Sequence, residues 1–201
     1  MRKLLEIGGI IAGLVLVVFG VAAISMGIDG RTTVRDSLKQ EQIVFGAVDD
    51  PAVAKFASKW ADKPLQTGTQ ARAFAQIMHE HALESSDGLA YAEMGRFVSA
   101  ADPQNPAGTS DETAALKDEK GNPVSNAARN TWVTATALST ALNVSYMAEQ
   151  MALFGIVVGI ALLLSGFGFI ILTVGALRRR ELAPAKAEKT AAGIKPTPAI
   201  N

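Results

Sequence analysis

The sequence contains no cysteine, which excludes disulfide bonds, zinc–thiolate sites and thiol nucleophiles. It also lacks the Gly-x-Ser-x-Gly and Ser-x-x-Lys patterns of hydrolases, and it has no glycine-rich phosphate-binding loop. These absences remove the best-known signatures of nucleophilic and nucleotide-dependent catalysis. We therefore expect no enzymatic activity, no cofactor and a fold that is held together by packing alone.

Charged residues are absent from two long segments, residues 7–28 and 151–177. As helices of about 22 and 27 residues they would measure roughly 33 and 40 Å, enough to cross a bilayer core of about 30 Å. We therefore predict an N-terminal transmembrane helix within residues 1–28 and a second transmembrane helix at residues 151–177. A cleaved signal peptide is the alternative for the first segment, although its apolar run continues beyond the weak cleavage motif at residues 21–23.

Basic residues flank the outer ends of both predicted spans, with Arg2 and Lys3 before the first and three arginines at 178–180 after the second. The positive-inside rule then predicts a plasma-membrane protein with both termini in the cytoplasm. Residues 29–150 become an extracytoplasmic domain, and residues 178–201 a disordered basic cytoplasmic tail. The extracytoplasmic part has more acidic than basic residues, so nucleic acid is not an expected partner.

The segment between the spans carries helix-start signals and no alternating strand pattern. Each signal combines a capping residue or proline with apolar residues at helical spacing. The expected helix starts are Asp50–Pro51, Thr67 or Thr69, Leu89, Ser110, and Ser125 or Asn126.

Residues 126–150 contain neither glycine nor proline, and no capping sequence separates them from the second span. We therefore expect one helix of about 55 residues, roughly 80 Å long, that runs from the domain into the bilayer. The predicted fold class is all-α: two transmembrane helices, the second continuous with a long extracytoplasmic stalk helix, and a small helical cap domain.

Two histidines, His79 and His81, make a metal site worth considering. Residues two apart on a helix point about 200° from each other, so these two side chains cannot chelate one ion. His81 and Glu84 could share a site, but a third ligand would have to come from elsewhere. We therefore expect no bound metal, with His81 as a partly buried residue on the stripe of Phe74 and Met78.

Small residues at four-residue spacing occur in both predicted spans: Gly9 and Gly13 in the first, Gly155 and Gly159 in the second. Such spacing lets helix backbones approach closely in lipid. These glycines therefore predict either an intramolecular hairpin or a homo-oligomer formed through the membrane helices.

Three aromatic residues, Trp60, Tyr91 and Trp132, are candidates for the domain core or for binding a protein partner. Trp132 lies about 19 residues, or nearly 30 Å of helix, before Met151, too far for an interfacial aromatic belt. We expect Trp132 to pack against Phe56, Trp60 or Phe74, with a partner-binding anchor as the alternative.

Four short segments resemble a family of uncharacterised two-transmembrane-helix membrane proteins from actinobacteria. They are RTTVRD at 31–36, HALE at 81–84, YAEM at 91–94 and NTWVT at 130–134. The resemblance runs from the first predicted span through the second. It implies the membrane topology and an actinobacterial cell envelope, and it implies no activity.

Three classes of function remain after these exclusions. The first is a non-enzymatic envelope protein whose helical domain binds a protein partner or supports a membrane assembly. The second is an extracytoplasmic ligand sensor, which would need a cytoplasmic or membrane partner because the tail is too short for a signalling domain. The third, a metal-dependent envelope enzyme, depends on His81 and Glu84 alone.

Overall fold

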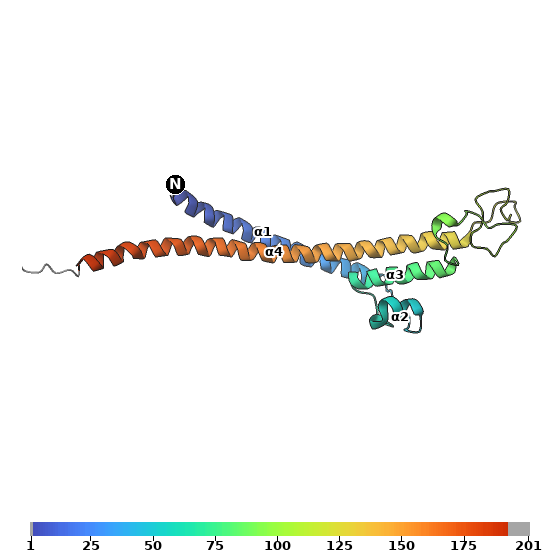
Figure 1. Ribbon diagram of the computed structural model, residues 1–201, viewed down its shortest axis with the longest axis horizontal. Coiled ribbons are helices and arrows are strands. Elements are labelled where there is room, and N and C mark those ends of the chain that lie inside the picture. Colours follow the sequence, from blue (N-terminus) through green and yellow to red (C-terminus); the bar gives the residue numbers. More distant parts are fainter. Residues whose placement is uncertain (1, 193–201) are drawn as a thin grey trace, which may run out of the picture. The chain divides into compact units, whose positions relative to one another are not determined.

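The computed structural model describes the backbone of residues 2–192 and the side chains of residues 6–175. Over this range the regular elements are helices (Figure 1), and strand pairing is limited to isolated bridges. In chain order they are α1 (Arg2–Gln40), α2 (Pro51–Ala57), the 3-10 helix η1 (Ser58–Trp60), α3 (Gly68–Ser85), the 3-10 helix η2 (Tyr91–Glu93) and α4 (Ala127–Ala192). The predicted all-α class is confirmed, and both α1 and α4 are long and apolar enough to cross a membrane.

The chain divides into two compact units. The first contains Met1–Ile28 and Leu153–Asn201, and the second contains Asp29–Ala152. Helices α1 and α4 each contribute residues to both units.

In the first unit, α1 and α4 form an intramolecular hairpin with a glycine seam. The seam has two reciprocal contacts, Gly13 with Gly166 and Gly20 with Gly159. A Cβ atom added to any of the four would lie 2.7–2.8 Å from the carbonyl oxygen of its partner. The backbones therefore touch directly, and within each helix the contacting glycines are seven residues apart.

Of the four glycines that the spacing predicts, Gly13 and Gly159 lie in these backbone contacts and the other two do not. Gly9 lies against the side chain of Thr173, and an added Cβ would come 2.6 Å from its hydroxyl oxygen. At Gly155 an added Cβ would make only an ordinary contact, 3.7 Å from the carbonyl oxygen of Ala23. Its Cβ position is open because the closest backbone approach lies one turn further along α4.

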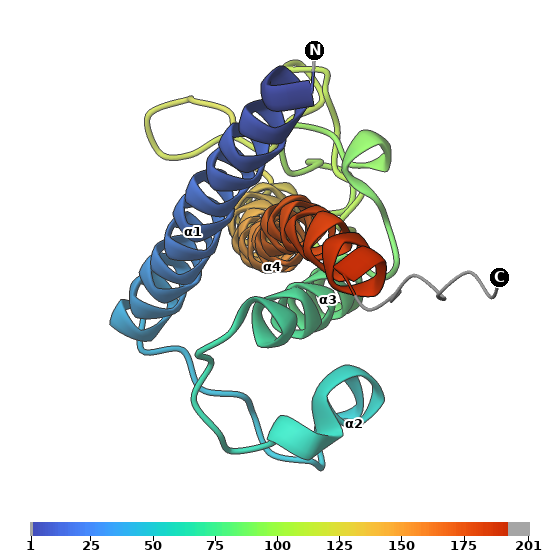
Figure 2. The same ribbon diagram turned by 90° about the vertical axis from the view of Figure 1, so that its left-hand side faces the viewer.

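In the second unit, α3 lies between α4 and α2, as the two views in Figures 1 and 2 agree. The predicted start signals of these helices are confirmed. Asp50 caps α2 by accepting hydrogen bonds from the backbone N–H groups of Ala52 and Val53. Thr67 caps α3 by accepting from Gln70. Both caps satisfy N–H groups that have no partner within the helix.

The core of the second unit is centred on Phe45, which is 2% exposed. Its ring stacks on Trp60 at a centroid distance of 5.9 Å and meets Phe74 edge-on at 5.5 Å. Val53 and Leu65 complete the most deeply buried apolar side chains around it. Of the three aromatic candidates from the sequence, Trp60 is thus the one that packs against the core.

The segment between Met94 and Asn126 is not helical, which corrects the predicted helices at 89–97 and after Ser110. Only the short η2 forms in the first of these. Phe97 then makes isolated antiparallel bridges to Thr109 and Ser125. The backbone of Phe97 and Val98 is hydrogen-bonded to residues far away in the chain, so these non-local bonds replace the helical ones.

Asn126 joins this irregular segment to the start of α4. Its amide nitrogen donates to the carbonyl oxygens of Gly95 and Pro106, at 3.1 and 2.8 Å. Its carbonyl oxygen accepts from the backbone N–H groups of Ala128 and Arg129, at 3.1 and 3.4 Å. One side chain, 4% exposed as a residue, therefore caps the helix and ties down two loop carbonyls.

Asn126→Ala is expected to destabilise the second unit by about 2 kcal/mol, because it removes a helix cap and takes the side-chain donor from two partly buried carbonyls. Urea unfolding followed by tryptophan fluorescence measures this, since both tryptophans lie in the unit. Asn130→Ala is the matched control on the exposed first turn of α4. Equal stability of the two variants would contradict the role of Asn126.

The C-terminal end of α4 corrects another prediction. The helix continues to Ala192, whereas the sequence predicts a disordered tail over 178–201. Alanine, lysine and glutamate make up most of residues 181–192 and are strong helix formers, so the helix that runs through the apolar segment continues into them despite Pro184. Residues 193–201 of the predicted tail lie outside the described residues.

Candidate functional site

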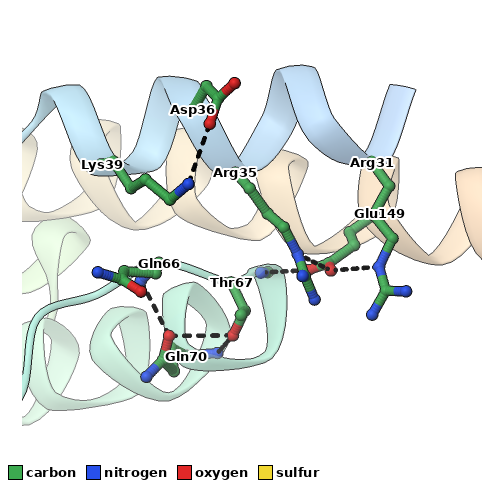
Figure 3. Close-up of polar contacts among 9 residues, drawn as sticks. Arg31, Arg35, Asp36, Lys39, Gln66, Thr67, Gln70 and Glu149 are labelled. Carbon is green, nitrogen blue, oxygen red and sulfur yellow. Dashed lines mark hydrogen bonds and ion pairs between the residues drawn. The ribbon is translucent and has the colours of Figure 1, made fainter. Parts of the chain in front are cut away.

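Glu149 on α4 is the centre of an ion-pair cluster that joins three helices of the second unit (Figure 3). Its Oε1 accepts hydrogen bonds from the Nε atoms of Arg31 and Arg35 on α1, at 3.0 and 2.9 Å. Its Oε2 accepts from the backbone N–H of Gly68 at the start of α3. The side chain of Glu149 is 6% exposed, so a carboxylate enters the packed interior with all of its partners in place.

Gly68 allows α3 to begin directly against α4. An added Cβ there would lie 2.8 Å from the Cα of Tyr146 and 2.9 Å from Oε2 of Glu149. Because the first N–H groups of a helix have no intrahelical partner and carry partial positive charge, a carboxylate is favoured at this place. Glu149 thus serves as an acceptor for the N-terminus of a different helix.

Burial raises the pKa of Glu149, but the hydrogen bonds from Arg31, Gly68 and Arg35 lower it more, and the net pKa lies below the ordinary value of 4.5. The carboxylate is therefore ionised in the folded protein throughout the neutral range. Its lowered pKa contributes stability that is present above pH 4.5 and is lost as the pH falls through the folded-state pKa.

Glu149→Gln is expected to reduce the acid sensitivity of the second unit. At pH 7 the variant should be less stable than the wild type, because the neutral amide loses its charge attraction to Arg31 and Arg35. As the pH falls below 4.5 the difference should shrink, since proton binding to the wild-type carboxyl then favours the unfolded chain. Urea unfolding across that pH series measures it, and a pH-independent difference would contradict the assignment.

A second feature is an apolar groove near the start of α4. It has a volume of about 480 Å³ and is lined by Tyr91, Trp132, Val133, Thr136 and Ala137. Arg129 lies over the Tyr91 ring at 4.3 Å, and it also donates a hydrogen bond to the tyrosine hydroxyl. The aromatic candidates Tyr91 and Trp132 are therefore brought together in one concave surface.

Trp132 does not pack in the core with Phe56, Trp60 or Phe74 as predicted. It is partly exposed, and its ring meets the ring of His79 edge-on at a centroid distance of 5.3 Å. The position of α3 explains the difference, because the core aromatics gather around Phe45 on the side of α3 that faces α2.

The exposed face of α4 within the second unit is unusually poor in charge. No charged residue occurs from Asn130 to Ala148. On this stretch Val133, Val144 and Met147 are 49%, 58% and 62% exposed. A solvated helix normally presents charged side chains on its outer face, so this surface has the character of a contact face.

The metal candidates are not brought together. The exposed His81 side chain pairs with Asp50, its Nε2 lying 3.1 Å from Oδ2, which corrects the predicted partly buried position. The short loop before α2 places Asp50 beside α3, a tertiary contact that helical periodicity does not reveal. Among the described residues no group of three histidine or acidic side chains could hold a metal, and Glu84 joins none.

A second, polar cavity of about 340 Å³ lies between α3 and α4. Its polar lining comes from Gln76, His79, Glu80, Ser139 and Asn143. Ser139 donates to the backbone carbonyl of Ala75 at 3.3 Å, so one of these groups is used by the fold. Glu80 pairs with Lys55 at 3.1 Å, and Gln76 and Asn143 can offer hydrogen bonds to a small polar ligand.

Sequence reasoning did not single out Glu149 or its two arginine partners as a site. One signal was present: Glu149 is the only acidic or basic residue between Arg129 and Arg178. An isolated acid next to a long uncharged segment requires a partner. Its partners are more than 100 residues away, so the sequence alone could not name them.

The described residues thus form an all-helical protein with two long apolar helices and a small, largely helical domain between them. Comparison with protein-family models, curated proteins and solved structures found no match. The resemblance to an actinobacterial family therefore remains a prediction.

Proposed function

We propose that this chain is a non-enzymatic integral membrane protein of a bacterial cell envelope, whose domain at residues 29–150 binds a protein partner outside the cytoplasm. Support for the membrane location comes from the two apolar helices and the basic residues beside them. In this proposal residues 7–28 and 151–177 span the bilayer. A supporting role of the same domain in a larger membrane assembly is part of this proposal.

The observation that carries the binding proposal is the uncharged face of α4. A partner helix with apolar side chains would cover Val133, Val144 and Met147, and no charge would be desolvated on this side of the contact. The aromatic groove at Tyr91 and Trp132 adjoins Val133 and supplies the kind of pocket that holds an anchor residue.

Position-specific cross-linking tests this proposal. A photoreactive residue at Val144 or Met147 of the full-length protein in its native membrane should give one discrete adduct, because these side chains would be covered. Thr131, which is also exposed and lies about 160° around the helix from Met147, is the matched control. Adducts of equal intensity at all three positions would overturn the proposal.

The topology is tested separately with a reporter that is active only outside the cytoplasm. The reporter should work when inserted after Pro106 and fail when fused after Asn201. The physical reason is the basic flanks of both apolar helices. A working C-terminal fusion would reverse the assignment.

The alternative function is an extracytoplasmic sensor for a small polar ligand. The polar cavity around His79 and Asn143 favours it, because several hydrogen-bonding side chains converge there. Asn143→Leu would then abolish a ligand-induced shift in melting temperature while leaving cross-linking at Met147 unchanged.

A further inference from the structure

We propose that Arg31 and Arg35 form a binding site for a phosphate group, and that the phosphate is supplied by phospholipid headgroups of the outer leaflet. The source of the phosphate depends on the proposed membrane insertion. The chemistry of the site does not depend on it. It gives the Glu149 cluster a ligand in addition to its structural role.

The first argument is that most N–H donors of the two arginines are not used within the cluster. A guanidinium has five N–H donors, and Arg31 and Arg35 each use only the one on Nε for Glu149. Their terminal amino groups extend beyond the carboxylate in Figure 3 and make no hydrogen bond within the described part of the chain. The two side chains are 41% and 36% exposed, so these donors are accessible.

The second argument concerns charge. One arginine neutralises Glu149, so the second leaves the cluster with one unbalanced positive charge. Arg72 adds another nearby, because it lies over the ring of Tyr146, one turn before Glu149 on α4, at 4.9 Å. The unit as a whole has more acidic than basic residues. The cluster is therefore a local positive site, and paired guanidinium groups suit a phosphate with several acceptor oxygens.

The acidic residues near Arg31 and Arg35 on α1 do not cancel this charge. Asp36 pairs with Lys39 at 3.1 Å. Asp29 is exposed and precedes Arg31 by two residues, which directs its side chain about 200° away around the helix. Only Glu149 reaches the two guanidinium groups among the described side chains.

The third argument is the position along the helices. Arg31 follows Ile28, the last residue of the uncharged segment, by three residues, or about 4.5 Å of helix. Glu149 precedes Met151 by two residues on α4. The headgroup layer is roughly 5–8 Å thick on each side of the bilayer core, so both helices place the cluster at its depth.

The direction of the side chains completes the geometry. Side chains on a helix lean toward its N-terminus, and on α1 this is the direction of the apolar segment. Arg31 and Arg35 therefore lean toward the bilayer surface. The carboxylate holds both through Nε, so the terminal amino groups are ordered before a phosphate arrives, which lowers the entropy cost of binding it.

The test uses the full-length protein in a neutral detergent, titrated with phosphatidylglycerol and followed by native mass spectrometry. Each net positive charge near an anionic surface contributes roughly fivefold to binding, and the cluster holds one net positive charge, so removing the cluster should weaken lipid binding about fivefold. The variant is R31Q/R35Q/E149Q, which removes all three charges together and keeps an amide oxygen to accept from Gly68. Lys39→Gln is the matched control on the same helix and should bind lipid like the wild type.

Inorganic phosphate, added to the same proteins, distinguishes the two sources. No displacement of lipid at millimolar phosphate supports the headgroup as ligand, whereas displacement supports the same chemistry with free phosphate as the occupant. Equal lipid binding by the wild type and the triple variant, with circular dichroism confirming that both are folded, would overturn the site. Recovery of the protein in the soluble fraction would instead overturn the proposed membrane function, whatever the phosphate result.

Discussion

Valine in place of Gly20 or Gly159 is expected to separate α1 from α4 in the apolar hairpin. The two residues face each other so closely that an added Cβ would lie 2.7–2.8 Å from the opposite carbonyl oxygen. The obstructing atoms are backbone, so they cannot move aside as a flexible side chain would. We expect a loss of about 3 kcal/mol or more of helix–helix packing, at or above the upper end of the usual cost of overpacking.

Cysteine cross-linking in bilayers measures this separation, because the natural sequence contains no cysteine. An added Cβ at Gly155 would lie 3.7 Å from the carbonyl oxygen of Ala23, so cysteines at these two positions should form a disulfide in the parent hairpin. The yield should fall several-fold when Gly20→Val or Gly159→Val is added.

Gly8 and Gly168 provide matched controls for the same experiment. They lie on the same two helices, but an added Cβ at either meets nothing within 4 Å. Gly8→Val and Gly168→Val should therefore leave the disulfide yield unchanged. Equal loss with all four valine variants would mean that valine disturbs insertion in general and that the seam has no special role.

The glycine seam also shows what sequence patterns reveal about helix packing. Four-residue spacing directs attention to Gly9 and Gly13, and to Gly155 and Gly159. The backbone contacts instead repeat every seven residues, at Gly13 and Gly20 on α1 and at Gly159 and Gly166 on α4. Glycines are frequent in both segments, so the pairs that touch depend on the register of the two helices, which no single segment contains.

Local chemistry predicted the starts of α2, α3 and α4, and non-local pairing decided the segment where the predicted starts at Leu89 and Ser110 were wrong. Asp50, Thr67 and Asn126 each act through hydrogen bonds to residues two or three positions ahead, so their roles are visible in a short window of sequence. Phe97 behaves differently, because its bridges reach Thr109 and Ser125. The same apolar residues could have formed a helix. The extended form is favoured because later segments of the chain fold back and pair with it.

The Glu149 cluster shows the same limit of sequence-based prediction for the candidate site. The sequence displays an isolated acid and two arginines four residues apart, but their partnership spans more than 100 residues of chain. Gly68 contributes only a backbone N–H, and no residue type predicts such a donor. Packing of α1 and α3 against α4 brings the four together, so the site follows from the tertiary fold.

Phe45→Ala is expected to destabilise the second unit by about 3–5 kcal/mol, the usual cost of emptying a phenylalanine site in a packed core. Phe45 is 2% exposed and contacts the rings of Trp60 and Phe74 from between them. Its loss leaves a cavity at the centre of the unit and removes two aromatic pairs, each of which contributes roughly 0.5–1.5 kcal/mol beyond buried area. Urea unfolding of the full-length protein, followed by fluorescence, gives the difference.

Trp132→Ala is the informative comparison, because replacing a buried Trp132 would lower the free energy of unfolding as much as replacing Phe45. The ring is partly exposed in the groove and has one described aromatic neighbour, His79. We therefore expect a cost of only about 1–2 kcal/mol, from partial burial and one edge-on ring contact. Hydrogen exchange should show wild-type protection of α2 and α3 in this variant and lost protection in Phe45→Ala. A cost for Trp132→Ala equal to that of Phe45→Ala would place Trp132 in the core after all, and would remove the groove as a free binding surface.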